Sequence, residues 1–487
     1  MSAILGCGDA SSQRSPQDEG AALAAPVPLH FVARRPVGAL PALGDAMRRH
    51  GRLIRGVQWA IVLAYAVLVV LPALLPLPDD AARILNHLGL FAQFLFWGIW
   101  WPFVLLSMVL LGRVWCGVFC PEGALSEAVS RHGRGRGIPR WMRWGGWPAG
   151  AFVITTIYGQ LVSVYQYPQA ALLVLGGSTV AAVLVGAWVG RGKRVWCRHL
   201  CPVGGVFGLL ARLAPLHFQV DRARWEARTG GITHLPNCAP LIDIRRMESA
   251  AACHMCGRCS GQRDAVTLVA RAPGSEIVRH GANTASGWDT ALLLFGLIGV
   301  AMGAFHWGAS PGFVALRVAL ADWAVERGWW WLLSDNAPWW LLTHYPQNQD
   351  VFVWLDGVLI VAYILATGLA VGAALYGLCL VAARALARPG AQHHLALAYV
   401  PLGGCGAFLG LSMTTVTMLR HEGLAVPWVD ATRALLLAGA ALWGLWLAWQ
   451  SSAVHSQSRA RRALATGLIA VGAGLVVAGW SALFFWW

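Results

Sequence analysis

Charged residues are scarce in this chain. They make up 12% of its 487 residues, while 57% are hydrophobic; a soluble globular domain usually has ~25% charged residues. Lysine is nearly absent, with Lys193 as the single example, so arginine carries almost all of the positive charge behind the net charge of +15. This composition excludes an ordinary soluble enzyme and is typical of a protein that crosses a membrane several times.

Three further features are missing. The arginines lie beside apolar runs rather than in a groove with stacking aromatics, so we expect no nucleic-acid partner. The segment from Met1 to about Pro26 lacks a basic stretch followed at once by an apolar run, so we do not expect it to be a secretory signal. We expect residues 1–50 to form a disordered tail that ends in a basic stretch. No C-x-x-C-H motif for covalent haem attachment occurs.

Apolar runs of the length needed to cross a bilayer, about 20 residues, occur nine times. They cover residues 57–77, 88–111, 146–165, 169–189, 289–307, 354–383, 396–418, 430–449 and 463–485. The expected fold class is therefore an all-α polytopic membrane protein with about nine transmembrane helices, embedded in membrane lipid.

Arginine is unevenly distributed among the connections between these runs. Arginines precede the first run and recur in the loops 112–145, 190–288, 384–395 and 450–462. Because cytoplasmic loops carry an excess of arginine and lysine, the N-terminus is expected inside and the C-terminus outside, in a bacterial inner membrane. The tryptophan-rich loop 308–352 then lies outside, as an interfacial helix or aromatic belt, or as a docking platform for an outside partner.

A short motif is written twice. "VWCGVFCPEG" occupies residues 114–123 and "VWCRHLCPVG" residues 195–204, and each follows a pair of apolar runs. We interpret residues 51–210 as a duplicated transmembrane hairpin, each copy ending in Cys-x-x-x-Cys-Pro. A polar segment, 211–287, follows and is expected to be a small cytoplasmic ferredoxin-like unit. Residues 288–487 complete the chain as a five-helix membrane domain.

Eight cysteines stand in close-spaced groups, which in a reducing compartment indicates metal or cluster binding rather than disulfides. The segment "CHMCGRC" has the C-x2-C-x2-C spacing that wraps a loop around three corners of an iron–sulfur cube. The fourth ferredoxin position is Arg263, and the nearest spare thiol is Cys238. Eight ligands are enough for two [4Fe–4S] clusters. The expected ligands are Cys116, Cys120, Cys197, Cys201, Cys238, Cys253, Cys256 and Cys259.

The sequence leaves the division of these ligands open. Either the two repeated motifs share one cluster and the other four cysteines hold the second, or Cys120 or Cys201 completes the C-x2-C-x2-C site. Zinc is the structural alternative, although four-cysteine zinc sites favour two C-x2-C pairs. Positive charge near the thiolates would offset their negative charge and raise a cluster's potential. The arginines in question are Arg113, Arg194, Arg198, Arg258 and Arg263. The three remaining cysteines, Cys7, Cys379 and Cys405, are expected not to be ligands.

The motifs resemble those of the NapH/NosR/CcoG group of membrane polyferredoxins over roughly residues 50–275. The resemblance implies two [4Fe–4S] clusters on the cytoplasmic side and electron exchange with a cytoplasmic or membrane redox partner. "CHMCGRCSGQRDAV", which lacks the fourth cysteine, is similar to the polyferredoxin subunit of ferrous-iron uptake systems of the FtrABCD type. That setting implies an iron permease of the oxidase-dependent kind and periplasmic iron- and copper-binding proteins as partners.

The expected function is electron transfer, as a subunit rather than a stand-alone enzyme, in ferrous-iron uptake. One alternative is a quinol dehydrogenase subunit that feeds a periplasmic reductase, and a second is a non-redox transporter with a zinc-binding cysteine domain. Side chains near the outer surface could also contact iron or copper, although such residues in membrane helices usually serve packing. These candidates are His306, His344, Met413, Met418 and His421.

Overall fold

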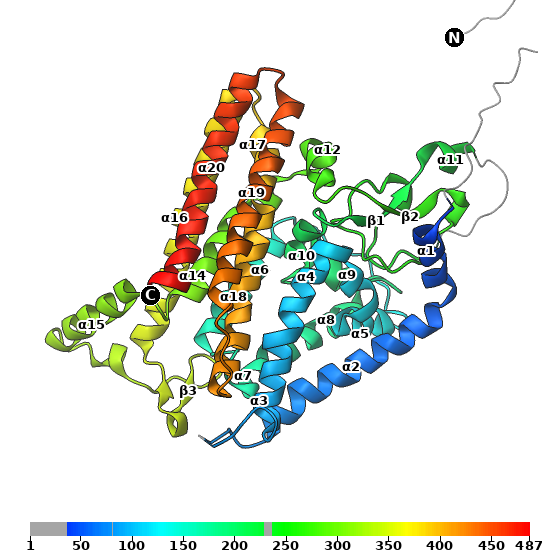
Figure 1. Ribbon diagram of the computed structural model, residues 1–487. Coiled ribbons are helices and arrows are strands. Elements are labelled where there is room, and N and C mark those ends of the chain that lie inside the picture. The colour runs from blue at the N-terminus through cyan, green and yellow to red at the C-terminus, as the bar shows by residue number, and fades with distance from the viewer. Residues whose placement is uncertain (1–36, 80, 228–235) are drawn as a thin grey trace, which may run out of the picture. The chain divides into compact units, whose positions relative to one another are not determined.

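The computed structural model describes residues 37–79, 81–227 and 236–487, and most of them are helical (Figure 1). Eight helical segments among these residues are long and apolar enough to cross a bilayer. They are Gly51–Leu74, Leu88–Leu111, Pro168–Trp188, Gly287–His306, Trp354–Ala385, Ala391–His421, Val429–His455 and Arg459–Trp486. The all-α polytopic membrane class is confirmed, and eight of the nine expected runs meet this length, while the run at 146–165 forms a shorter helix. Cys7 lies outside the described residues.

The first half of the chain contains two helical units of the same layout, preceded by the amphipathic helix α1 (Ala39–Arg49). Each unit has a helix, a second helix with a π-helical stretch, a helical turn that carries the cysteine motif, and a final helix. The first unit contains α2 (Gly51–Leu74), α3 (Leu88–Gln93), η1 (Phe94–Trp100), α4 (Trp101–Leu111), η2 (Trp115–Phe119) and α5 (Pro121–Ser130). The second contains η3 (Trp141–Arg143), α6 (Trp147–Leu161), α7 (Pro168–Ala171), η4 (Leu172–Gly176), α8 (Gly177–Trp188), α9 (Val195–His199) and α10 (Gly204–Ala211).

The remaining expected span, 146–165, corresponds to α6, which has only 15 residues. Just before α6, Trp144 packs edge-to-face on Trp288 at a centroid distance of 5.0 Å. Near its end, Gln160 accepts a hydrogen bond of 2.9 Å from the indole of Trp307. Trp288 and Trp307 lie at the two ends of the span Gly287–His306. The helix α6 therefore runs beside almost the whole length of that span despite being shorter.

A small antiparallel hairpin lies between the two halves of the chain. Its strands β1 (Leu216–Val220) and β2 (Val266–Ala270) pair with Phe218 opposite Leu268. The loops and short helices between and after them carry the third cysteine group. These elements are α11 (Arg222–Ala227), η5 (Ile244–Arg246), η6 (Gln262–Asp264) and α12 (Ser275–Thr284). The helix α1 packs against β2, and Figure 1 draws it beside the hairpin.

The second half of the chain is a helical bundle with one long excursion. Its membrane helices pack on one another through small and aliphatic residues. They are α13 (Gly287–Ala291), η7 (Leu292–Val300), α14 (Ala301–His306), α16 (Trp354–Ala385), α17 (Ala391–Ala396), η10 (Leu397–Tyr399), α18 (Val400–His421), α19 (Val429–His455), α20 (Arg459–Ser481) and η11 (Ala482–Trp486). The excursion contains α15 (Pro311–Glu326), η8 (Trp330–Leu333), β3 (His344–Tyr345), η9 (Pro346–Asn348) and β4 (Asp350–Val351).

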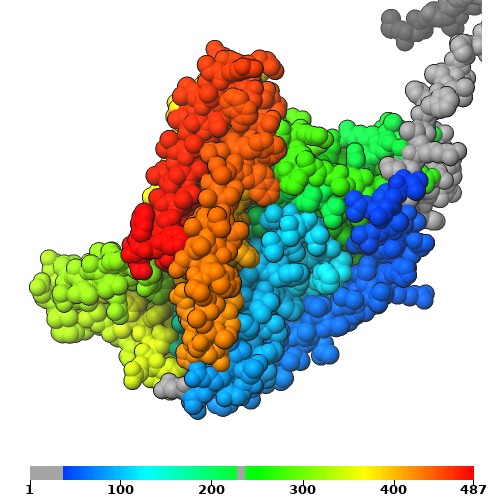
Figure 2. Space-filling model, viewed as in Figure 1, coloured from blue at the N-terminus to red at the C-terminus, as the bar shows by residue number. Residues whose placement is uncertain are grey.

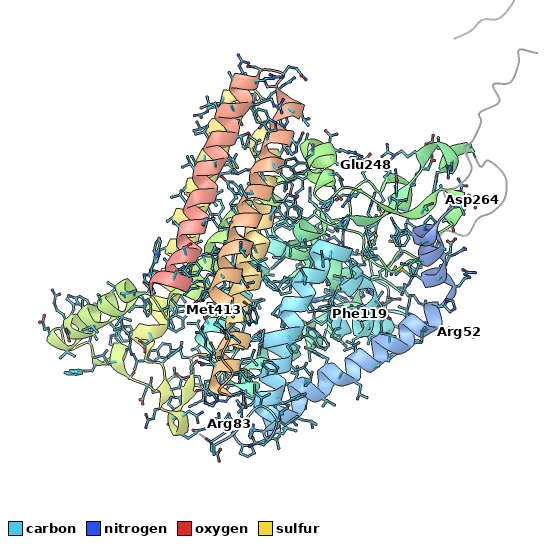
Figure 3. The ribbon with its side chains drawn as sticks, viewed as in Figure 1. Arg52, Arg83, Phe119, Glu248, Asp264 and Met413 are labelled. Carbon is cyan, nitrogen blue, oxygen red and sulfur yellow. The ribbon has the colours of Figure 1, made fainter. Side chains whose placement is uncertain are left out.

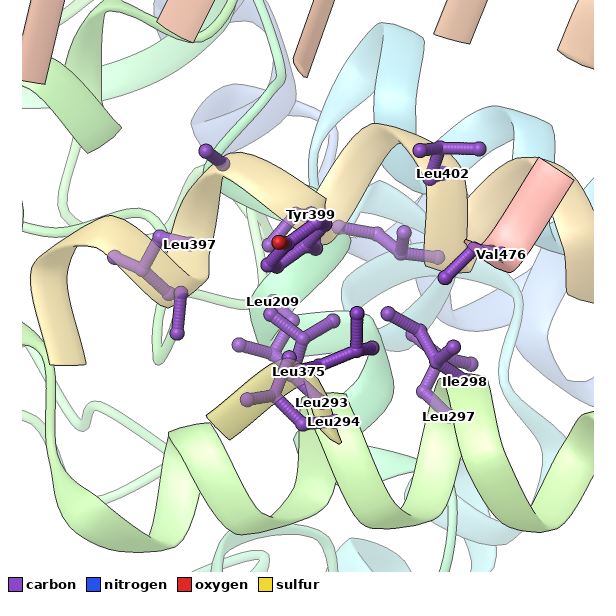
Figure 4. Packing of buried hydrophobic residues seen from close by; sticks show 14 of the residues in the cluster. Leu209, Leu293, Leu294, Leu297, Ile298, Leu375, Leu397, Tyr399, Leu402 and Val476 are labelled. Atoms are coloured by element: carbon purple, nitrogen blue, oxygen red, sulfur yellow. The ribbon is translucent and has the colours of Figure 1, made fainter. Parts of the chain in front are cut away.

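One continuous apolar core joins the two halves (Figure 4). It combines Leu209 of α10 with Leu293 of η7, Leu375 of α16 and Val476 of α20. The buried Tyr399 crosses this core, and its hydroxyl donates to the Ile469 carbonyl at 3.1 Å. Cys379 and Cys405 belong to this core, far along the chain from the cysteine motifs. They occupy the environment of small apolar side chains.

The tryptophan-rich excursion covers the end of the second hairpin. The Thr343 backbone N–H donates to the Leu161 carbonyl at 2.8 Å, and the Tyr167 hydroxyl donates to Asp350 at 2.7 Å. Trp330 remains 62% exposed, as expected of an aromatic belt. Because α7 begins here and α8 ends at the cysteine motif, the excursion and the cysteine motifs lie at opposite ends of the second hairpin.

Candidate iron–sulfur centre

The two repeated motifs close with the same backbone bond. The Cys120 N–H donates to the Trp115 carbonyl at 2.8 Å, and the Cys201 N–H donates to the Trp196 carbonyl at 2.9 Å. Each motif is thus a single wide helical turn, which brings its two cysteines onto one side. A proline follows each turn and cannot continue it. The internal duplication seen in the sequence is therefore repeated in the local structure.

Proline also sets the position of the second cysteine in the first motif. Cys120 is extended, with φ −66° and ψ 118°, as the residue before a proline usually is. Pro121 then begins the new helix α5, and the Gly123 N–H donates to the Cys120 Sγ at 3.4 Å. The sulfur thus caps a helix N-terminus, where unpaired N–H groups and the helix dipole favour a thiolate.

The two motifs contribute one set of thiols, which we name the motif set. It consists of Cys116, Cys120, Cys197 and Cys201. Burial is the largest cause that raises the pKa of Cys197 to about 12, and the nearby Cys116 raises it further. Burial also raises the pKa of Cys120 and Cys201, with added repulsion from the other members of the set. Across the repeat, the Trp196 indole donates to Glu122 at 3.1 Å and ties one motif to the other.

The other four thiols form a second set, which we name the loop set. It consists of Cys238, Cys253, Cys256 and Cys259. Burial raises the pKa of Cys253 to about 12, and Cys256 and Cys238 add to this. The pKa of Cys259 is raised well above its usual value by burial and by the other three members of the set. Cys253 also packs with Cys238 and Cys259 in the small core under the β1–β2 hairpin. Cys238 therefore lies with the C-x2-C-x2-C loop, whereas Cys120 and Cys201 lie with the repeated motif.

Backbone contacts explain how a thiol so far from the others in sequence joins the loop set. The turn before the second motif forms hydrogen bonds with the segment around Cys238. The Arg194 N–H donates to the Ala239 carbonyl at 2.8 Å, Lys193 donates to the Cys238 carbonyl at 3.1 Å, and Asn237 donates to the turn in return. The only lysine of the chain thus helps to place a candidate ligand.

The two sets meet at Gly117, between the cysteines of the first motif. A Cβ on this residue would lie 1.9 Å from the His254 carbonyl oxygen and 2.9 Å from the Cys256 nitrogen. The loop set therefore packs backbone-to-backbone on the first motif, which only glycine permits. The Gln58 side chain of α2 is buried here and donates to the Gly117 carbonyl at 2.8 Å.

Buried arginines lie between the two sets. Arg194 is 2% exposed in its side chain and pairs with Glu127 at 2.9 Å, while its guanidinium also donates to the Cys116 carbonyl. It interacts electrostatically with thiols of both sets. Arg113 does the same and donates to the Ala251 carbonyl at 2.6 Å. These side chains place positive charge where two groups of thiolates would otherwise repel each other.

Glu127 anchors this charge arrangement. It accepts from Arg194, from Arg258 at 2.8 Å and from Arg131 at 3.0 Å. Burial favours its neutral form, but the Arg194 and Arg258 charges outweigh burial and lower the pKa of Glu127. The carboxylate therefore stays ionised and fixes both arginines beside the thiols.

The donor set fits a thiolate-ligated cluster. Among the described residues, Arg113 Nε and Arg194 Nη2 are buried without a hydrogen-bond partner, and unpaired buried donors are costly. The sulfur atoms of a cluster accept such hydrogen bonds, which also tune its potential. Of the five arginines noted in the sequence, Arg263 differs in its contacts, which include Trp225. It donates to the Trp225 carbonyl at 2.9 Å and lies over the Trp225 ring.

A single-ion site is not formed in the described part of the chain. No three histidine, cysteine, aspartate or glutamate side chains there are close enough to hold one metal ion. Zinc needs its thiolates within about 2.3 Å of one ion, whereas the ligands of a cubane bind separate irons at its corners. The zinc alternative stays a prediction for metal analysis to test.

The outer candidates are spread over separate elements. His306 of α14 directs Nδ1 to the Met302 carbonyl at 2.6 Å and Nε2 to the Gly479 carbonyl at 2.8 Å. It therefore has no free nitrogen for a metal. The other four lie in β3 and α18, where Figure 3 labels Met413: His344, Met413, Met418 and His421. Metal contact by these four stays a prediction.

Sequence reasoning missed Gln58, Glu127 and the contact made by Gly117. Gln58 left a signal, because it is a lone amide in an otherwise apolar run. Glu127 is a carboxylate within an arginine-rich connection, a weaker signal. The role of Gly117 had no local signal, since it depends on a loop that lies more than a hundred residues later.

Comparison with known proteins finds a match at the two repeated motifs. A model of the 4Fe-4S binding domain matches residues 93–139 and 172–220, so that each matched segment contains one copy of the repeated motif. The chain is 27% identical to YccM of Escherichia coli, assigned to electron transport, over 237 residues. It is 30% identical over 159 residues to the methylamine utilization ferredoxin-type protein MauN of Methylorubrum extorquens. It is 27% identical over 188 residues to the regulatory protein NosR of Pseudomonas aeruginosa.

These alignments are partial on both sides. They cover 42%, 29% and 33% of this chain and 64%, 50% and 25% of YccM, MauN and NosR respectively. No solved structure matches the chain. The 4Fe-4S domain and these relatives confirm the resemblance to the NosR/NapH type of membrane polyferredoxin.

Proposed function

We propose that this membrane protein of the NosR/NapH type, with its 4Fe-4S binding domain, transfers electrons through two [4Fe–4S] clusters. One would be held by the motif set and the other by the loop set. The observation that carries the proposal is that the eight thiols interact electrostatically within two groups of four, while the buried Arg113 and Arg194 interact with thiols of both groups. A cluster of this kind takes up or releases one electron without breaking a bond.

The chain's own residues would prepare both sites for that chemistry. Arg113 and Arg194 offset thiolate charge and supply unpaired donors, which favours the more reduced, more negative state. Contact between the sets at Gly117 keeps the two sites adjacent, so that an electron can pass from one to the other. Burial in the core of the membrane domain keeps water away from Cys116.

We place both clusters at the cytoplasmic face of a bacterial inner membrane. The arginine-rich connections 112–145 and 190–288 contain the ligands, and such connections remain inside. Reporter fusions test this placement. A fluorescent protein should be bright at the N-terminus, alkaline phosphatase should be active at the C-terminus, and the reverse pattern would refute it.

We infer that ferrous-iron uptake is the pathway. An oxidase-dependent permease takes Fe(III), so oxidation of Fe(II) outside releases an electron that this chain would accept. Support comes from "CHMCGRCSGQRDAV", in which the ferredoxin-like fourth cysteine is absent. A strain that lacks the gene should take up less radioactive Fe(II) under iron limitation, and the intact gene should restore uptake. Undiminished uptake would reject this pathway without bearing on the clusters.

The clusters themselves are tested by anaerobic purification. Iron and acid-labile sulfide should each reach about eight per chain, as two cubanes require. After reduction with dithionite, EPR should show the signals of interacting [4Fe–4S]⁺ centres. Zinc without sulfide would refute the proposal.

A further inference from the structure

A basic pocket opens where α1 meets α2. Its volume is about 370 Å³, and six arginines line it without any acidic side chain. They are Arg48, Arg49, Arg52, Arg55, Arg131 and Arg258. The pocket also reaches Gly117, Gln58 and Cys256. The charged rim thus adjoins a thiol of the loop set and the contact between the two sets.

Within the described ranges, most of this positive charge has no counter-ion. Arg131 and Arg258 pair with Glu127. The four arginines at the α1–α2 corner are exposed, and no ion pair joins them to any residue in the described ranges. Figure 3 labels Arg52 at the outer edge of this corner. Figure 2 draws the dark-blue surface of α1 and the start of α2 facing outward there.

The pocket is held in place by the loop that carries Cys256 and Cys259. Met47 of α1 packs so closely on the loop that a Cβ at Gly257 would lie 2.5 Å from the Met47 Cβ. Asp45 of α1 accepts from the Ser260 hydroxyl at 2.8 Å. Since α1 is fixed to the residues around Cys256 and Cys259, a partner held by its arginines would lie next to that cluster.

We propose that this pocket is the docking site for a soluble, acidic one-electron carrier protein, which exchanges its electron with the cluster of the loop set. This inference rests on the proposed function. The reduced carrier would lose one electron and the oxidised cluster would gain it, so that no bond or proton changes place. In the opposite direction the same site would serve an oxidised carrier.

The chemistry of the pocket favours a protein over a free nucleotide or a lipid headgroup. Guanidinium forks bind carboxylates in pairs of parallel hydrogen bonds. No aromatic side chain lines the pocket to stack on a flavin or nicotinamide ring. Its exposed arginines surround a redox ligand, an arrangement that a lipid headgroup would not use. A charged rim of this kind steers an oppositely charged protein and raises its association rate.

Binding provides the first test. An acidic [2Fe–2S] ferredoxin is titrated onto the full-length protein in nanodiscs of neutral phosphatidylcholine at low ionic strength, and its Kd is measured. Changing Arg48→Gln, Arg49→Gln and Arg52→Gln together should raise the Kd at least 10-fold and flatten its salt dependence. A matched variant carries Arg388→Gln in the α16–α17 connection and Arg459→Gln and Arg461→Gln in the first turn of α20, where all three side chains are exposed; it should leave the Kd within 2-fold.

Reduction kinetics give the second readout. The rate at which reduced ferredoxin bleaches cluster absorbance should fall at least 10-fold in the α1–α2 variant, while reduction by dithionite is unchanged. In the opposite direction, the rate at which dithionite-reduced clusters pass electrons to oxidised cytochrome c, a basic carrier, should not fall. Equal effects of the two triple variants would overturn the inference. Arginine-dependent retention of phosphatidylglycerol or of flavin mononucleotide, without ferredoxin binding, would also overturn it in favour of that ligand.

The iron count separates the two proposals. A preparation without iron and sulfide defeats the proposed function and this inference with it. A preparation with about eight irons that dithionite reduces, but that ferredoxin neither binds nor reduces, defeats the docking site alone.

Discussion

Replacing Gly117 with alanine tests how the two thiol sets are joined. The added methyl carbon would lie 1.9 Å from the His254 carbonyl oxygen, whereas side-chain carbons essentially never come within 3.0 Å of such an atom. The difference requires the two segments to separate by about 1.1 Å. Ligand distances in metal sites vary by only ~0.2 Å, so a shift of this size is incompatible with ligation by the displaced thiols.

The loop should be the part that moves. The motif turn η2 is buried, and its Trp115 and Cys116 belong to the main core of the membrane domain. The residues from Cys253 to Cys256 lie in no helix or strand. We therefore expect G117A to lose about four of eight irons, namely those of the loop set, at an overpacking cost of about 1–3 kcal/mol.

Iron and sulfide counts with EPR measure this outcome. Gly56→Ala in α2 is the matched control, because nothing lies within 4 Å of a Cβ there; it should keep all the iron. Size-exclusion chromatography and thermal unfolding confirm that both variants are folded. If G117A retained the full iron content and an unchanged EPR spectrum, the close approach of the loop to the first motif would be wrong.

Two further predictions follow from the same site. Glu127→Gln leaves the buried Arg194 without its carboxylate partner and should lower the free energy of unfolding, measured by denaturant titration, by about 3–5 kcal/mol. The control Glu226→Gln removes an exposed ion pair and should change the free energy of unfolding little. Because the pKa of Glu127 is lowered in the fold, its contribution is present above the unfolded value of about 4.3 and is lost as pH falls through the folded pKa; E127Q should lack this acid-side loss. Cys238→Ala should remove about four irons and Cys379→Ala none; full iron in C238A would instead assign Cys120 or Cys201 to the loop set.

The membrane helices were the most predictable part of the fold. The run expected at 88–111 is observed as Leu88–Leu111, and that expected at 354–383 as Trp354–Ala385. A bilayer demands a length and an apolar composition that can be read directly from the chain. The exception is α6, which is shorter than the adjacent span although Trp144 just before it and Gln160 near its end contact residues at the two ends of that span.

The cysteines were predictable as candidates but not as partners. Spacing, with the prolines that follow the two repeated motifs, predicted seven of the candidates, since it reflects local backbone geometry; Cys238 was added as the nearest spare thiol. Their division depends on contacts between distant segments, such as Lys193 with the Cys238 carbonyl and Arg194 with Ala239. A sequence pattern does not reveal such long-range contacts. The arginines also follow from membrane topology, so the sequence alone does not show which guanidinium groups lie near the thiols.

The difference between the two copies of the motif follows from this packing. Duplication alone would give two equivalent positions after the first cysteine, yet one is Gly117 and the other is Arg198. The loop set can lie against only one copy, and that copy must carry glycine because the His254 carbonyl fills the space of a side chain. The other copy keeps room for a long side chain. Burial and Arg113 lower the pKa of Arg198, and Cys238 offsets part of that effect, so Arg198 lies near one thiol of the loop set. A symmetric pair of hairpins thus becomes an asymmetric site because a single polar segment docks on it.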